Sequence, residues 1–163
     1  MLEHFYREAS GGGALCYDRM LEQAEAFIDQ CGMDAIWKVR TTFSGTRSDP
    51  DARGSIAGIG MENFRPGALT AGLVMGILEE LKEAFDAMQA LTGAHPGKLV
   101  GSGNGLRRNP LMQRMAEGLF GLKLLIPAHM EEAAYGAALC AMAASGMRPS
   151  LADAQKLIRY EGE

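Results

Sequence analysis

The chain has 163 residues, of which 47% are hydrophobic, enough for one domain with a substantial core. Its 16 Lys and Arg residues against 20 Asp and Glu residues give a net charge of -4, without a basic stripe. This balance argues against a nucleic-acid partner and gives no attraction to a membrane surface.

The cysteines and the N-terminal sequence indicate the cellular compartment of the protein. Cys16, Cys31 and Cys140 are scattered and odd in number, which argues against a disulfide framework and against a zinc knuckle. The opening "MLEHFYREASGGGALCY" lacks the apolar stretch of a secretory signal, and no later run is long enough to cross a bilayer. We therefore expect a cytoplasmic protein with no membrane partner.

The first two predicted elements are a helix and a short strand. The helix ends at Gly32, and apolar residues recur in it near helical spacing: Leu15, Met20, Leu21, Ala24, Phe27 and Ile28. A β-like run follows from Ile36 to Phe43. A long irregular loop comes next, punctuated by Gly45, Pro50, Gly54, Gly58 and Gly60.

The segment from Pro66 to Leu91 predicts the longest helix. Pro66 suits its first turn, and an apolar residue recurs at every fourth position: Leu69, Leu73, Ile77, Leu81 and Phe85. Gly72 and Gly76 weaken the intrinsic helix propensity, so we expect them to lie where another element packs closely.

A strand, a glycine-rich loop and a helix are predicted next. Lys98–Val100 has the character of a short buried strand, and the three glycines of "GSGNG" (Gly101–Gly105, here the glycine loop) follow it. Glycine lets the backbone adopt positive φ and expose its N–H groups. Asn109 and Pro110 then form an N-cap and a first-turn proline for the helix "LMQRMAEGLFG".

The rest of the chain predicts one more strand and two helices. Leu122–Ala128 has the length and apolarity of a strand, and "MEEAAYGAALCAMAASG" predicts a helix that opens with Glu131 and Glu132. Leu151–Ile158 predicts a terminal helix. No repeat or linker interrupts the sequence, so we expect a single domain over residues 1–163.

The glycine loop favours an anion, with phosphate the natural ligand. Main-chain N–H groups and a helix N-terminus converge where a strand, a glycine-rich loop and a helix follow one another. A tight turn without a ligand is the competing interpretation of the same glycines. The loop is not a Walker A sequence, because no Lys-Ser/Thr follows, and it is not a full G-x-G-x-x-G. Because the G-x-G-x-x-G motif is incomplete, a Rossmann dehydrogenase is the less favoured interpretation of this loop.

The acidic and histidine side chains predict neither a catalytic residue nor a metal ligand. Glu131 and Glu132 suggest general-base chemistry, but their place at a helix start favours a structural role there. His4, His95 and His129 share no metal-ligand spacing.

Several motifs together resemble the C-terminal signature of the FGGY carbohydrate kinases. Leu99–Gly146 has the family's order of a glycine-rich loop, a helix that starts near Asn, a strand that ends in Pro and an "E-x-A-x-G-A-A" helix. Gly45–Ile59, "GTRSDPDARGSIAGI", resembles the family's upstream loop "G-E/T-R-x-P-x-x-R-G". The motifs "GGGALCYDRML" (Gly11–Leu21) and "SGNGLRRNP" are most similar to the sedoheptulokinase branch.

The resemblance implies a fold, a reaction and site residues. The fold is α/β, an incomplete C-terminal ribonuclease-H-like domain of the actin and hexokinase ATPase type, helix-rich with a short sheet. The reaction is transfer of the γ-phosphate of ATP to a ketose such as sedoheptulose, with Mg²⁺ bridging the phosphates. The matched cofactor-binding positions are Gly101, Ser102, Gly103 and Asn104, at the α-phosphate and ribose of ATP, and Arg108 and Asn109, at the adenine. For Asn109 a plain N-cap is favoured over direct contact with adenine, and the two roles are compatible.

The resemblance also implies that the chain is one part of a kinase. In the family, a sugar-binding domain and a catalytic aspartate in a "G-D-x-x-A" segment precede the sequence present here, so we expect no kinase activity from the chain alone. A stand-alone nucleotide-binding or assembly module is the alternative. A sheet that is short of strands leaves an unpaired edge, which is a reason to expect self-association.

Overall fold

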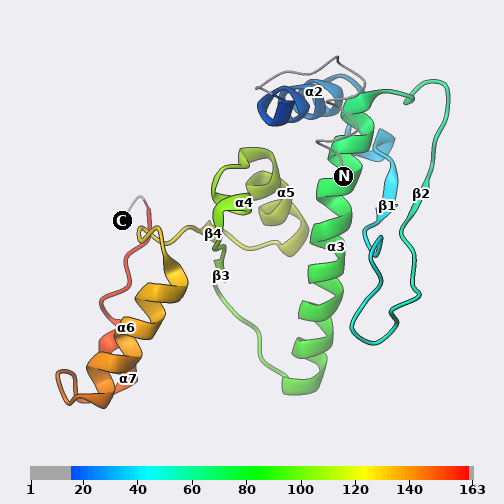
Figure 1. Cartoon of the computed structure of the whole chain (residues 1–163). Coiled ribbons are helices and arrows are strands. Elements are labelled where there is room, and N and C mark those ends of the chain that lie inside the picture. The colour runs from blue at the N-terminus through cyan, green and yellow to red at the C-terminus, as the bar shows by residue number, and fades with distance from the viewer. Residues whose placement is uncertain (1–15, 162–163) are drawn as a thin grey trace. The chain divides into compact units, whose positions relative to one another are not determined.

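The computed structural model describes residues 16–161, with the side chain of Cys16 left aside. These residues form two compact units that divide between Ala94 and His95 (Figure 1). His4 and the first part of the "GGGALCYDRML" motif, including Leu15, lie outside the described residues.

The first unit combines helices with a two-stranded sheet. In chain order its elements are α2 (Cys16–Cys31), η1 (Met33–Ala35), β1 (Lys38–Arg40), β2 (Ser55–Ala57) and α3 (Pro66–Thr92). The strands pair antiparallel, with Val39 opposite Ile56. The first helix and the β-like run lie where the sequence predicts them. β2, however, lies within the loop that the sequence predicts to be irregular.

The ends of α3 agree with the sequence prediction to within one residue. Pro66 occupies its first turn, where the missing N–H of proline costs no helical hydrogen bond. Gly93 ends the helix in the left-handed conformation, at φ 66°, and its N–H donates to the carbonyl oxygen of Gln89 at 2.8 Å.

The buried face of α3 differs from the apolar stripe in the sequence. Leu73 is buried, but Ile77 and Leu81 are 42% and 55% exposed. The buried face consists mainly of small residues: Gly67, Ala68, Thr70, Ala71, Gly72, Leu73, Val74, Gly76 and Leu78. Small residues are buried here because α2 and β1 lie against this part of the helix at short range.

Gly72 and Gly76 lie where another element packs closely, which confirms the sequence prediction. A Cβ atom on Gly72 would meet the carbonyl oxygen of Trp37, and one on Gly76 would meet that of Val39. Both oxygens belong to the main chain, so a change of side-chain rotamer cannot move them away. The close approach of α3 to β1 therefore requires glycine at both positions.

A buried asparagine closes the core of the first unit. The core gathers the side chains of Phe27, Trp37, Val39, Ala68 and Leu73. The Trp37 Nε1–H donates to the main-chain oxygen of Asn63 at 3.1 Å. The side-chain amide of Asn63 donates to the carbonyl oxygens of Ala35, at 3.0 Å, and Gly58, at 2.8 Å. These bonds fix the loop between β2 and α3 to the segment before β1.

The second unit contains the strand predicted at Lys98–Val100, but the prediction that this strand is buried is wrong, because Leu99 is half-buried and Val100 is 47% exposed. Its elements are β3 (Leu99–Val100), α4 (Asn104–Arg107), α5 (Pro110–Phe120), β4 (Leu124–Leu125), α6 (Glu132–Ala144) and α7 (Leu151–Gln155). β3 and β4 are parallel, and the N–H of Gly101 continues their pairing by donating to the oxygen of Leu125 at 3.0 Å. The predicted α/β class, helix-rich with short sheets, is confirmed, although the described residues form two separate two-stranded sheets.

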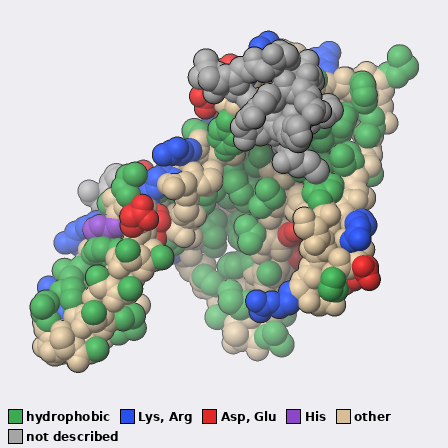
Figure 2. All heavy atoms as spheres, viewed as in Figure 1, with side chains coloured by type: hydrophobic (Ala, Val, Ile, Leu, Met, Phe, Trp, Pro, Cys, Tyr) green, Lys and Arg blue, Asp and Glu red, His purple; other side chains and the backbone are tan. Residues whose placement is uncertain are grey.

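Hydrophobic side chains cover much of the surface of α6 and α7, as Figure 2 shows. Leu139 is the buried residue of α6, and the alanines around it are mostly exposed. No helix within residues 16–161 is both long enough and apolar enough to cross a membrane.

Candidate functional site

The glycine loop leaves the carboxyl end of β3 and leads directly into α4. Gly103 is the N-cap of this four-residue helix, at φ 91° and ψ 150°. The N–H of Arg107 donates to the oxygen of Gly103 at 3.0 Å, and the N–H of Arg108 to that of Asn104 at 3.1 Å. The helix that directly follows the glycine loop is therefore the short α4, which the sequence does not predict, and the predicted helix with Asn109 as its N-cap begins after it.

The three glycines have three different reasons to be glycine. Gly101 is buried, and a Cβ there would meet the side chains of Leu106 and Leu124. Gly103 has the positive φ that disfavours other residues. Gly105 is exposed, and a Cβ there would meet nothing within 4 Å. Only at Gly103 does the positive φ expected of the loop occur.

Asn109 is an N-cap, as one of its two interpretations predicts. Its side chain is buried, and its Oδ1 accepts a hydrogen bond from the N–H of Met112 at 2.9 Å. Pro110 follows in the first turn of α5. Arg108, beside it, is exposed. Contact of either residue with adenine stays a prediction.

We expect Asn109→Ala to lower the free energy of unfolding of the second unit by about 1 kcal/mol, because the Met112 N–H loses its partner. Urea denaturation followed by circular dichroism measures the change. The matched control is Arg108→Ala, which removes the exposed neighbouring side chain and leaves stability unchanged. Equal stability of the two variants would contradict the capping role.

A charged pair that the sequence does not predict lies beside the glycine loop. The Nη2 of Arg107 is 2.7 Å from Oε1 of Glu132, and the two side chains are 13% and 23% exposed. The carboxyl ends of parallel strands lie at the same edge of a sheet, which brings the start of α6 next to the loop after β3. Glu132 lies in the first turn of α6, whereas Glu131 is the N-cap residue without a side-chain capping bond.

The pKa of Glu132 is held below its usual range. The hydrogen bond from Arg107 is the largest cause, followed by the main-chain N–H of Glu132 itself, and the N–H of Gly103 also contributes. Glu132 is therefore an ionised group that is paired with Arg107 at the start of α6. This ion pair agrees with the structural role expected of Glu132, whereas Glu131 makes no side-chain capping bond.

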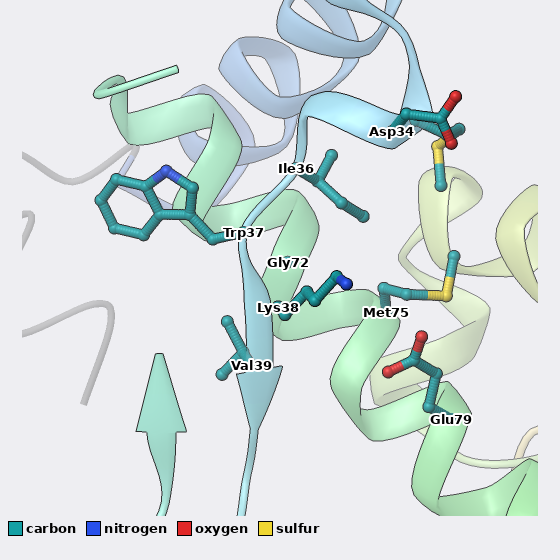
Figure 3. Close-up of a pocket in the computed structure, with 9 residues that line it drawn as sticks. Asp34, Ile36, Trp37, Lys38, Val39, Gly72, Met75 and Glu79 are labelled. Carbon is teal, nitrogen blue, oxygen red and sulfur yellow. The ribbon is translucent and has the colours of Figure 1, made fainter. Parts of the chain in front are cut away.

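The first unit contains a cavity of about 480 Å³ beside β1. Figure 3 shows Ile36 and Lys38 pointing into it, opposite Met75 and Glu79 of α3, while Trp37 points away. None of the predicted cofactor-binding residues lines this cavity. The glycine loop therefore remains the candidate site.

The glycine loop suits a phosphate group through its main chain. Residues 102–105 are exposed, and the Cβ directions of Gly103 and Gly105 point into open space, so a ligand can approach the backbone. Across residues 16–161, no three His, Cys, Asp or Glu side chains are arranged to hold a metal ion. We therefore assign none of the described residues to Mg²⁺.

Residues 33–145 match the FGGY family of carbohydrate kinases, C-terminal domain. The chain belongs to this family. The crystal structure of a xylulose kinase from Rhodospirillum rubrum is similar, with a TM-score of 0.78 at 20% identity over 99% of this chain and 31% of that chain. A gluconate kinase from Lactobacillus acidophilus has a TM-score of 0.77 at 16% identity, over 98% of this chain and 32% of that one.

A third similar structure is a glycerol kinase from Plasmodium falciparum solved with ADP. Its TM-score is 0.66 at 22% identity, over 93% of this chain and 30% of the kinase. This FGGY C-terminal domain thus spans about a third of the length of the solved kinases that it matches. At such identities the likeness shows the fold alone, and the match of residues 33–145 to the family confirms the family expected from the motifs.

Proposed function

We propose that this FGGY C-terminal domain, residues 1–163, is part of the nucleotide-binding domain of an ATP-dependent sugar kinase. The observation that carries the proposal is the exposed glycine loop at the carboxyl end of a parallel strand. Open α/β sheets bind their ligands outside the carboxyl ends of their strands. The ADP in the glycerol kinase of Plasmodium falciparum supports a nucleotide as the ligand.

The residues of the loop have distinct parts in this proposal. Ser102, Gly103 and Asn104 offer exposed main chain to the α-phosphate and ribose, while buried Gly101 keeps the loop against β4. Arg108 and Asn109, which follow α4, are proposed to lie at the adenine. Bound ATP supplies the phosphoryl group, and Mg²⁺ neutralises charge on its phosphates.

The acceptor is proposed to be a ketose, such as sedoheptulose. The support is the similarity of "SGNGLRRNP" and "GGGALCYDRML" to the sedoheptulokinase branch. We expect the complete kinase to act in the cytoplasm. The chain alone is expected to be inactive, because phosphoryl transfer requires a sugar and a nucleotide to be positioned against each other.

Isothermal titration of the pure chain with Mg-ADP tests the proposal. We expect one nucleotide to bind per chain, and no sugar phosphate to form when ATP and a panel of ketoses are added. Absence of binding at millimolar Mg-ADP would contradict the proposal. Absence of binding together with a stable dimer in light scattering would favour the alternative, an assembly module.

A further inference from the structure

Arg107 connects the turn after the glycine loop to three other segments. Its side chain is largely buried, at 13% exposure. The Nη2 group donates to the carbonyl oxygens of Pro127, at 2.7 Å, and His129, at 3.1 Å, and it pairs with Glu132 at 2.7 Å. The Nη1 group pairs with Glu161. A single guanidinium therefore holds the end of α4, the chain after β4, the start of α6 and the C-terminal segment together.

Glu161 is held in place by its own main chain. Its N–H donates to the oxygen of Ile126 at 2.8 Å, and the N–H of Ala128 donates to the oxygen of Arg159 at 2.9 Å. Pro127 and Tyr160 form an antiparallel bridge between these segments. Residues 159–161 therefore extend along residues 126–128, which brings Glu161 within reach of Arg107, although the Glu161 side chain is 56% exposed.

Glu132 carries the effect of Arg107 to the glycine loop. Its carboxylate pairs with Arg107 at 2.7 Å, and the N–H of Gly103 is one of the groups that lower the pKa of Glu132. The main-chain N–H of Arg107 in turn donates to the oxygen of Gly103 at 3.0 Å. Without Arg107, a negative charge would remain beside the main chain that is proposed to receive phosphate. The same loss would leave the end of α4 without its bonds to Pro127 and His129.

We propose that Arg107 is a positioning residue for nucleotide binding. It holds the glycine loop in the backbone conformation that binds phosphate, and it neutralises the charge of Glu132 near Gly103. The inference rests on the proposed function. Arg107 itself is engaged by protein groups, so it acts through Glu132 and the loop rather than on the nucleotide. The motif resemblance points to its neighbour, exposed Arg108, instead.

The first test combines Mg-ADP titration with hydrogen exchange of the amides of residues 103–108 in the full chain. In Arg107→Ala we expect the Kd to rise about tenfold or more, and these amides to exchange faster. Arg107→Lys keeps the positive charge but cannot form the several hydrogen bonds of the guanidinium group. Its Kd and its amide exchange rates should therefore lie between those of the wild type and those of Arg107→Ala. The control Lys123→Ala removes an exposed positive charge of the same unit and should leave both quantities unchanged.

The second test separates charge from packing. In Arg107→Ala/Glu132→Gln the uncompensated carboxylate is gone, so we expect part of the lost affinity to return. The affinity deficit of Arg107→Ala should also shrink as salt is raised, because ions screen the repulsion between Glu132 and phosphate. If Arg107→Ala does not fold, Arg107→Lys and Arg107→Lys/Glu132→Gln provide the same comparison.

Two results would overturn the positioning role. One is wild-type affinity and wild-type exchange in Arg107→Ala. The other is a double variant that binds no better than the single variant at any salt concentration, which would reduce Arg107 to a packing residue. Failure of the proposed function is distinguishable, because the wild-type chain itself would then bind no Mg-ADP, and the positioning role would fall with it.

Discussion

Gly103→Val is expected to raise the Kd for Mg-ADP at least thirtyfold, about 2 kcal/mol, while the chain keeps its fold. Gly103 combines φ 91° with ψ 150°, a conformation that is essentially restricted to glycine and that costs another residue about 1–3 kcal/mol. The valine loop must therefore leave this conformation. Its N–H then no longer points where the phosphate is proposed to lie, and the added side chain covers the main chain.

The matched control is Gly105→Ala, two residues along the same loop. Gly105 lies inside α4 without a positive φ, and a Cβ there meets nothing within 4 Å. We expect the alanine variant to bind Mg-ADP within about threefold of the wild type. Titration calorimetry measures both variants, and circular dichroism verifies their helix content. Equal binding by Gly103→Val and Gly105→Ala would mean that the backbone conformation at Gly103 is irrelevant to the ligand.

Gly76→Val is expected to destabilise the first unit by about 3 kcal/mol. The new Cβ would meet the carbonyl oxygen of Val39, a main-chain atom of β1, so relief requires the helix and the strand to separate. Valine is a slightly better helix former than glycine, so the loss cannot come from helix propensity. In scanning calorimetry the midpoint of unfolding of this unit should fall by roughly 10–20 °C.

Gly118→Val controls for the substitution itself. Gly118 lies within α5 and is exposed, and a Cβ there would meet nothing within 4 Å. We expect its midpoint to lie within a few degrees of the wild type, because surface substitutions of this kind change stability by less than about 0.5 kcal/mol. A Gly76 variant as stable as the Gly118 variant would show that α3 does not need its close approach to β1.

The elements with strong local signals are predictable from the sequence. Pro66 and Pro110 mark the first turns of α3 and α5, and Gly93 and Gly121 end the same helices in the left-handed conformation. Each signal acts on its own neighbours, through fixed φ or through freedom from a Cβ. The N-cap role of Asn109 follows from the same local logic.

Other features depend on contacts that the local sequence does not contain. β2 is short, lies among glycines and exists through its pairing with β1. The α4 turn consists of "NGLR", which has weak helix propensity. The sequence gives no signal for the role of Arg107, because its acidic partners, Glu132 and Glu161, lie 25 and 54 residues away. Nothing in the local pattern distinguishes it from Arg108; only the folded chain does.

The most direct measurement is an amide NMR spectrum of the isotope-labelled chain, recorded while Mg-ADP is added. The nucleotide site proposed at the glycine loop predicts chemical-shift changes concentrated on residues 101–109, with smaller changes at Glu132. Changes concentrated instead on the cavity residues Lys38, Met75 and Glu79 would contradict this placement. An unchanged spectrum at saturating Mg-ADP would show that the chain has no nucleotide site.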